Sequence, residues 1–124
     1  MKQLVIKDER GQIVAWLGSR DEFLAQKDAA NFLGQSVIEP MAWIDWVESA
    51  SPGNGTLLMQ ETLSILDAEG VKLVGLEVFP KTPDHLDGLI RFYEKFGFVD
   101  VSAVLKGNDF PIMFRESTWN GIET

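Results

Sequence analysis

The segment Gly53-Asn54-Gly55-Thr56-Leu57-Leu58 joins a predicted strand, Met41–Ser49, to a predicted helix, Thr56–Glu69. Tryptophan and β-branched residues favour the strand, and apolar side chains at helical spacing favour the helix. A glycine turn that opens a helix leaves backbone N–H groups unpaired at the positive end of the helix dipole. The segment therefore predicts a site for an anion such as a phosphate or pyrophosphate.

A nearly continuous apolar run, Val71–Phe79, follows the helix and predicts a strand that is buried on both faces. Strand, helix and strand at this spacing form a βαβ unit, whose crossover should be right-handed. Alternation along the first strand predicts that Trp43, Asp45 and Val47 share one face and that Ile44, Trp46 and Glu48 share the other.

Six further elements complete a predicted order of β-β-α-β-α-β-α-β-β. Strands are predicted over Gln3–Lys7 and Gln12–Leu17, and helices over Arg20–Leu33 and Thr82–Phe96. Two last strands, Phe98–Leu105 and Phe110–Arg115, are connected by a turn at Lys106–Asp109. This order predicts a single α/β domain over residues 1–116, with a mixed α+β sheet whose parallel part is covered by helices on both faces. Residues 117–124 are expected to form a C-terminal tail.

Composition narrows the classes of function. The chain of 124 residues has no cysteine and one histidine, His85, so disulfides, a cysteine nucleophile and a metal site are not expected. Its net charge is −8 and its basic residues form no patch, which argues against nucleic-acid binding. No signal peptide or run of about 20 apolar residues is present, so we expect a cytoplasmic protein without a membrane segment.

A second motif, further along the chain, strengthens the interpretation of the glycine turn at Gly53–Leu58. The run Ile90-Arg91-Phe92-Tyr93-Glu94-Lys95-Phe96-Gly97-Phe98 predicts a helix that ends on a glycine and leads into a strand. With the strand and glycine turn at Gly53–Leu58, this run resembles the signature of the GNAT superfamily of acetyl-CoA-dependent N-acetyltransferases. The resemblance covers most of the chain and implies a central mixed sheet flanked by helices. The family usually begins with a strand and two helices, and this short chain is expected to begin after them.

The resemblance also implies a co-substrate site for acetyl-CoA. The pyrophosphate would bind the backbone N–H groups from Asn54 to about Leu58. Two parallel strands that splay apart near Trp46–Glu48 and Gly75–Val78 would hydrogen-bond the pantetheine arm and supply an oxyanion donor. The implied coenzyme-binding residues are Trp46, Val47, Gly53, Asn54, Gly55, Thr56, Leu57 and Leu58.

The chemistry implied is direct attack of a primary amine on the thioester in a ternary complex. Tyr93 matches the tyrosine that often protonates the leaving thiolate in GNAT enzymes, although its spacing equally fits an apolar helix face. A general base must take a proton from the amine, and Glu48 and Glu77 are the candidates, with Asp45 beside them. The acceptor would be a small-molecule amine or a peptide amine.

Two other classes of function stay open. A non-catalytic GNAT-like module would bind acyl-CoA or a protein partner. Ala50 favours it because the family usually has arginine or glutamine there, and Pro52 favours it because proline lacks an N–H donor. An acidic interaction protein that shares only the fold is the third hypothesis. A homodimer is left open as a way to complete the acceptor side.

Overall fold

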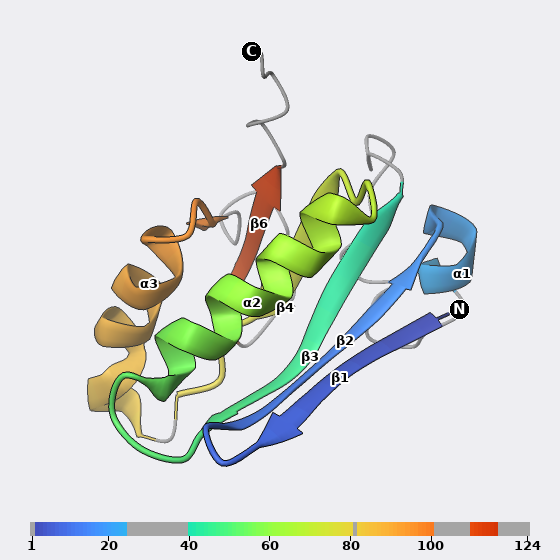
Figure 1. The fold of residues 1–124 in the computed structure, drawn as a ribbon. Helices are drawn as coiled ribbons and strands as arrows, with labels where there is room; N and C mark the ends of the chain where they lie inside the picture. Colours follow the sequence, from blue (N-terminus) through green and yellow to red (C-terminus); the bar gives the residue numbers. More distant parts are fainter. Residues whose placement is uncertain (1, 25–39, 81, 101–109, 117–124) are drawn as a thin grey trace, which may run out of the picture.

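The computed structural model describes residues 2–24, 40–80, 82–100 and 110–116, which form a six-stranded sheet with helices packed on it (Figure 1). The strands lie in the order β1-β2-β3-β4-β6-β5, and among the described strands only β3 and β4 are a parallel pair of neighbours. The strands are β1 (Lys2–Asp8), β2 (Gly11–Gly18), β3 (Met41–Ser49), β4 (Leu73–Glu77), β5 (Val99–Asp100) and β6 (Ile112–Glu116). The helices are α1 (Arg20–Leu24), α2 (Asn54–Ala68) and α3 (Leu86–Glu94), the last preceded by a short 3-10 helix, η2 (Pro83–His85).

The predicted order of elements is confirmed for the described residues, with shifted boundaries. Helix α2 begins two residues before the predicted start at Thr56, because Gly53 adopts a left-handed conformation (φ 92°) as its N-cap. Strand β4 is shorter at both ends than the predicted strand, and α3 begins after Thr82 and ends before Phe96, the predicted ends of that helix. Residues 25–33 of the predicted first helix, 101–105 of the predicted strand, the turn at 106–109 and the tail at 117–124 lie outside the described residues.

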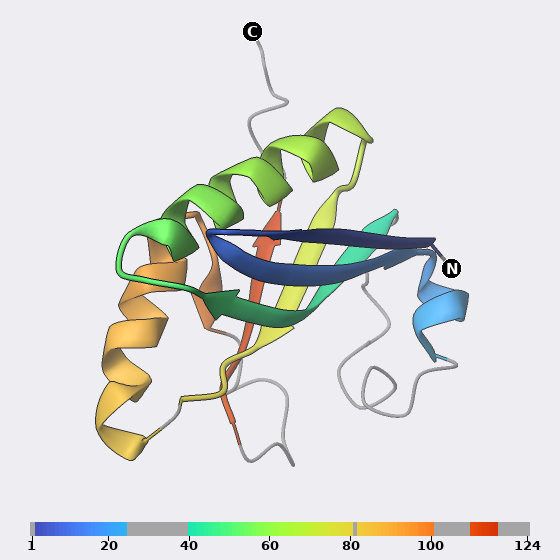
Figure 2. The ribbon, with the colours of Figure 1, turned by 60° about the horizontal axis from the view of Figure 1, so that its bottom comes forward.

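Helices α2 and α3 lie on the same face of the sheet (Figure 2). The crossovers from β3 to β4 and from β4 to β5 move in the same direction across the sheet, so two right-handed crossovers place both helices on one side. The main core lies between these helices and the sheet and includes Ile13, Ala15, Ile44, Leu58, Leu66, Leu76, Tyr93 and Phe98. On the opposite face, the described part of α1 contributes Phe23 to a second cluster.

The second cluster depends on a glycine in the middle of β4. The register places Gly75 between Trp43 of β3 and Phe114 of β6. A Cβ atom at Gly75 would collide with the Phe114 ring and would lie 2.8 Å from Cζ3 of Trp43. Two aromatic rings can therefore close over this strand only because position 75 has no side chain.

One ion pair connects three elements on the helical side of the sheet. Nη1 and Nη2 of Arg115, on β6, donate to the two carboxylate oxygens of Asp67, on α2, at 3.1 Å each. Nε of Arg115 donates to the carbonyl oxygen of Phe96, after α3, at 3.0 Å. The side chains of Arg115 and Asp67 are only 14% and 17% exposed. This bidentate pair fixes how α2 and the end of α3 sit on the sheet.

The replacement Arg115→Ala should lower the free energy of unfolding by about 3 kcal/mol, since it leaves a largely buried carboxylate without its charged partner. Chemical denaturation followed by circular dichroism measures the change. Lys2→Ala is the control, because the Lys2–Glu69 pair is exposed and should contribute less than about 1 kcal/mol. Equal destabilisation by the two replacements would contradict a stabilising role of the Arg115 contacts.

Candidate functional site

Strands β3 and β4 pair with each other over only part of their lengths. Their parallel register runs from Met41↔Leu73 to Ile44↔Leu76 and then ends. Beyond that point β3 continues beside β2 to Ser49, while β4 continues beside β6, where the Val78 N–H donates to the Pro111 carbonyl oxygen at 2.8 Å. The two strands therefore part, as Figure 2 shows. Among the described residues, the facing edges of the parted strands have no strand partner, which suits them to bind an extended polar chain.

A β-bulge lies on β3 at the point of parting. Ile44 is opposite Ala15 and Trp46 is opposite Val14, so Asp45 is an extra residue. The predicted alternation is therefore wrong beyond Asp45, because the bulge reverses which side chains face the helices. Val47 packs against the main core, on the same side as Ile44. Trp46 is left 55% exposed, and Glu48 is exposed.

The start of α2 presents backbone N–H groups without partners. Gly53 is the N-cap and no side chain caps the helix. The Asn54 N–H donates to the Ser51 carbonyl oxygen at 3.2 Å, whereas the N–H groups of Gly53, Gly55 and Thr56 have no partner among the described residues. The N–H groups of Leu57 and Leu58 fall within the helical ladder, and the Leu58 side chain is fully buried. Three unpaired donors at the positive end of a helix dipole have the chemistry that an anion prefers.

The turn before α2 is held by its own hydrogen bonds. The Ser49 hydroxyl donates to the Ser51 carbonyl oxygen at 2.6 Å, and the Asn54 side-chain amide donates to the Ser51 hydroxyl at 2.7 Å. The β1–β2 hairpin supports the turn from outside, since the Ala50 N–H donates to the carbonyl oxygen of Arg10 at 2.8 Å. The free N–H groups of α2 are thus fixed in place before any ligand arrives.

Arg10 is a basic residue near this turn that the sequence alone did not indicate, because it precedes Gly53 by more than forty positions. Its guanidinium group is held by two carboxylates, Asp8 at 2.6 Å and Glu61 at 2.8 Å. Hydrogen bonding from Arg10 lowers the pKa of the Asp8 carboxyl group. Arg10 therefore joins the hairpin to α2 and is already neutralised by its neighbours.

Tyr93 lies on α3 close to the start of α2. A Cβ atom placed on Gly55 would stand 3.6 Å from Cζ of Phe92, and the rings of Phe92 and Tyr93 are 5.2 Å apart. Tyr93 is 8% exposed, and burial raises the pKa of its hydroxyl group. No hydrogen bond joins this hydroxyl to another described residue. Tyr93 is thus a protonated, largely desolvated acid one aromatic ring away from the helix N-terminus.

The three candidate acids and bases come from three elements. Glu48 is exposed near the end of β3, and Glu77 is half-buried as the last residue of β4. They stand on the two strands that part, one on each side of the gap. Asp45 is exposed at the bulge, and His85 is exposed at the end of η2.

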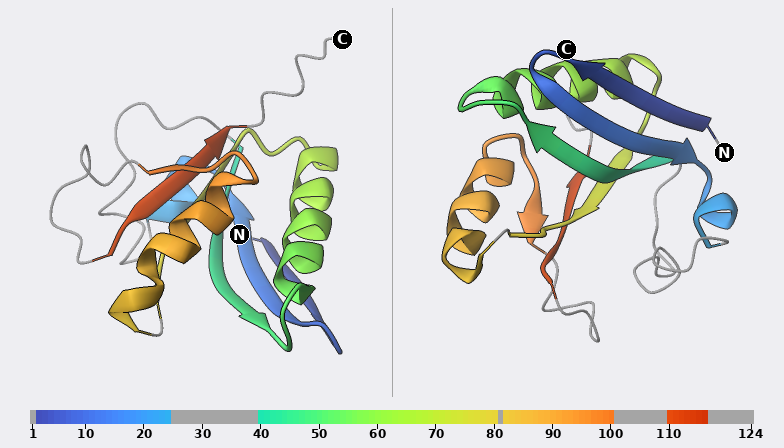
Figure 3. Two further views of the ribbon diagram at one scale, coloured as in Figure 1. Left: turned by 90° about the vertical axis from the view of Figure 1, so that its left-hand side faces the viewer. Right: turned by 90° about the horizontal axis from the view of Figure 1, so that it is seen from below.

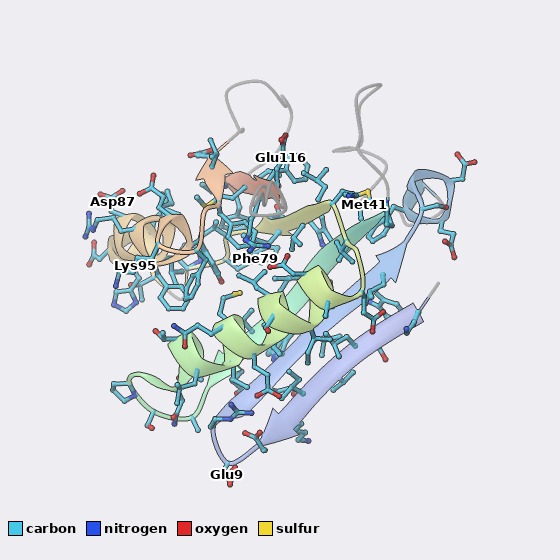
Figure 4. The ribbon with its side chains drawn as sticks, turned by 45° about the horizontal axis from the view of Figure 1, so that its top comes forward. Glu9, Met41, Phe79, Asp87, Lys95 and Glu116 are labelled. Atoms are coloured by element: carbon cyan, nitrogen blue, oxygen red, sulfur yellow. The ribbon has the colours of Figure 1, made fainter. Side chains whose placement is uncertain are left out.

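A separate cavity of about 490 Å³ lies at the other end of the sheet, beside Met41 and Glu69, and none of the predicted site residues lines it. Figure 4 labels Met41 at that end and Glu9 at the opposite end, where the hairpin turn lies. The polar side chains that line this cavity already have partners, for example Lys2 with Glu69 at 3.0 Å.

Within the described ranges, no helix is long and apolar enough to span a membrane. Nor do their His, Cys, Asp and Glu side chains form a group of three that could hold a metal ion.

Tyr93 is the single tyrosine of the chain, so its ionisation can be followed alone by absorbance at about 295 nm. Because burial raises the folded-state pKa above the ordinary 10.0, tyrosinate should appear only above that pH. The linked contribution to stability is complete below pH 10.0 and is lost as the pH rises toward the folded-state pKa. Titration at or below pH 10.0, with circular dichroism unchanged, would contradict a buried hydroxyl.

Comparison with known proteins gives structural relatives only. No protein-family model matches the chain, and no curated protein matches it in sequence. A crystal structure of the anti-CRISPR protein AcrVA5 superposes with a TM-score of 0.59 and 20% identity, covering 92% of this chain and 98% of that chain. An acetyltransferase crystal structure superposes with a TM-score of 0.50 and 18% identity, covering 84% of this chain and 63% of that one.

These similarities concern the fold, since both identities are below 25%. They agree with the mixed α+β sheet described above. The chain has a mixed α+β sheet flanked by helices, a fold similar to that of these two solved structures, one of which is an acetyltransferase.

Proposed function

We propose that this protein is an N-acetyltransferase that transfers the acetyl group of acetyl-CoA to a primary amine. The observation that carries the proposal is the parting of β3 and β4 directly before a helix whose first N–H groups are unpaired. The unpaired strand edges would bind a ligand chain that contains amide groups, and the start of α2 would bind the phosphates at one end of the same ligand. Acetyl-CoA has both parts, joined in that order, and it supplies an acetyl group activated as a thioester.

The residues present fit the coenzyme by the chemistry of their donors. The N–H groups of Gly53, Gly55 and Thr56 would bind the pyrophosphate. The unpaired backbone edge of β3 at Trp46 and Val47 would bind the pantetheine amides, and one N–H there would stabilise negative charge on the thioester oxygen. These backbone donors would bind the phosphates without a free basic side chain, since the dipole of α2 provides the positive potential.

Two kinds of side chain would transfer protons, a carboxylate as general base and a tyrosine as general acid. Glu48 or Glu77 would take a proton from the ammonium group of the acceptor, directly or through water. The amine nitrogen would then form its bond to the acetyl carbon as the carbon–sulfur bond breaks, and its second proton would pass to solvent or restore the proton that Tyr93 gives up. Tyr93 would give a proton to the departing thiolate, and its raised pKa keeps that proton in place until it is needed.

The acceptor would approach from the side of β3 where Trp46 is exposed. An exposed indole attracts an ammonium group by a cation–π interaction. The neighbouring carboxylates of Asp45 and Glu48 and the net charge of −8 favour a cationic acceptor in the same way. The proposed acceptor class is therefore a cationic primary amine, either a small molecule or a peptide amine.

The second candidate is a non-catalytic module that binds acyl-CoA or a protein partner. It is favoured by the electrostatics of the turn, where Pro52 has no N–H and Arg10 is already paired with Asp8 and Glu61. A weak phosphate site could bind a coenzyme without supporting turnover. Coenzyme binding and turnover must therefore be measured separately.

Calorimetric titration with acetyl-CoA, without an acceptor, should give saturable one-to-one binding. Gly55→Asp should weaken it at least about tenfold, since a carboxylate would then face the phosphates. A Cβ at position 55 meets only ordinary contacts at 3.6 Å, and because Gly55 is buried, the melting temperature of the variant checks its folding. Ser64→Asp, exposed on the same helix, is the control for added charge and should bind like the wild type. Absence of heat and of thermal stabilisation at millimolar acetyl-CoA would argue against the whole proposal.

Tyr93→Phe should lower kcat by about 100-fold while leaving the affinity for acetyl-CoA nearly unchanged, because it removes a general acid and keeps the ring. Steady-state assays with a panel of amines measure the effect. Phenylalanine preserves the packing on Phe92 and Phe98, so the melting temperature serves as the control for folding. Equal turnover in the two proteins would remove Tyr93 from the mechanism, whereas coenzyme binding without turnover by the wild type would favour the non-catalytic module.

A further inference from the structure

Strand β1 forms one edge of the sheet, and no other described strand lies along its outer side (Figure 3). It pairs over its full length with β2 alone, from Lys2↔Leu17 to Asp8↔Gly11. Alternate residues of an edge strand direct their N–H and C=O groups away from the sheet. An open edge of seven residues is therefore a template on which another strand can pair.

The sequence of this edge is complementary to itself. When Lys2-Gln3-Leu4-Val5-Ile6-Lys7-Asp8 is turned antiparallel about Val5, Lys2 lies opposite Asp8 of the second copy. In the same register Gln3 lies opposite Lys7, Leu4 opposite Ile6, and Val5 opposite Val5. Residues directly opposite in an antiparallel pair interact, and like charges placed there are destabilising. This register sets opposite charges and apolar side chains against each other, although Lys2 and Asp8 also have charged partners within their own subunit, and it sets no like charges against each other.

The two faces of β1 also suit this pairing. Leu4 and Ile6 pack against the main core and are half-buried, so Ile6 and Leu4 of a second copy would extend an apolar surface already present. On the other face, Val5 is 47% exposed and lies in a cross-strand row with Val14 and Trp46. Pairing at the edge would bring two exposed Val5 side chains together.

The helices leave room for the second copy. Helix α2 makes its main contacts to the sheet with β2 and β3. With strands about 4.8 Å apart, α2 and its counterpart would be separated by roughly 19 Å, more than the 8–10 Å of packed helices. Strand pairing at β1 therefore does not bring α2 against its counterpart in the second copy.

We propose that β1 pairs antiparallel with β1 of a second copy of this chain, with Val5 on the two-fold axis, so that the two six-stranded sheets become one. The interface is small for a stable complex, so the dimer should be weak and dependent on concentration. The proposal does not rest on the acetyltransferase function, because the edge lies outside the parted strands. The opposing possibility is that Lys2, Lys7 and Asp8 guard the edge against such pairing.

Sedimentation velocity of the purified full chain, over a range of concentrations, tests the proposal. Gln3→Glu would place a carboxylate opposite Lys7 of the second copy twice per dimer and should lower the dimer dissociation constant about fivefold. Gln3→Lys would place like charges there and should raise it about fivefold. Both effects should shrink in about 1 M salt. Gln60→Glu and Gln60→Lys, exposed on α2, make the same changes in net charge and should have no effect.

A dimer whose affinity follows the order Gln3→Glu, wild type, Gln3→Lys supports the proposal. A wild type that stays monomeric up to millimolar concentration would overturn it and favour the guarding role of the edge charges. A dimer whose affinity is unchanged by the Gln3 variants, or changed equally by the Gln60 variants, would also overturn it, since the subunits would then meet elsewhere.

Discussion

The early end of the pairing between β3 and β4 is the constraint on which the site depends. Two neighbouring parallel strands normally satisfy each other's backbone N–H and C=O groups along their length, but here four residue pairs form before the strands separate. Each strand then continues beside another neighbour, β2 or β6, so the separation leaves each strand supported on its other side. An extra residue, Asp45, lets β3 turn away while it stays paired with β2. The sheet thus keeps its stability and still presents free backbone groups.

The elements and their order could be predicted because their signals are local. The apolar run before Glu77 and the helical spacing after Gly53 each belong to one element, and both elements are found. The bulge at Asp45 could not be predicted, since it exists only in the register with β2 and nothing in the run Trp43–Val47 marks it. Its effect reaches the site, because it decides that Trp46 faces solvent and Val47 the core.

Long-range electrostatics were likewise invisible in the sequence. The turn at Gly53 has no basic residue near it in the chain, yet pairing of β1, β2 and β3 brings Arg10 beside Ala50. The same contacts surround Arg10 with Asp8 and Glu61. Arg115 is similarly occupied by Asp67. In this acidic protein these two arginines hold elements together, so the charges of both are already matched by carboxylates.

The crowding around Gly75 has a consequence for how this sheet can change during evolution. Trp43, Gly75 and Phe114 belong to three adjacent strands but share one volume. A larger residue at position 75 could be accepted only after one of the two rings had become smaller. Substitutions at these three positions should therefore occur together among descendants of this chain, and any one of them alone would pass through a poorly packed intermediate.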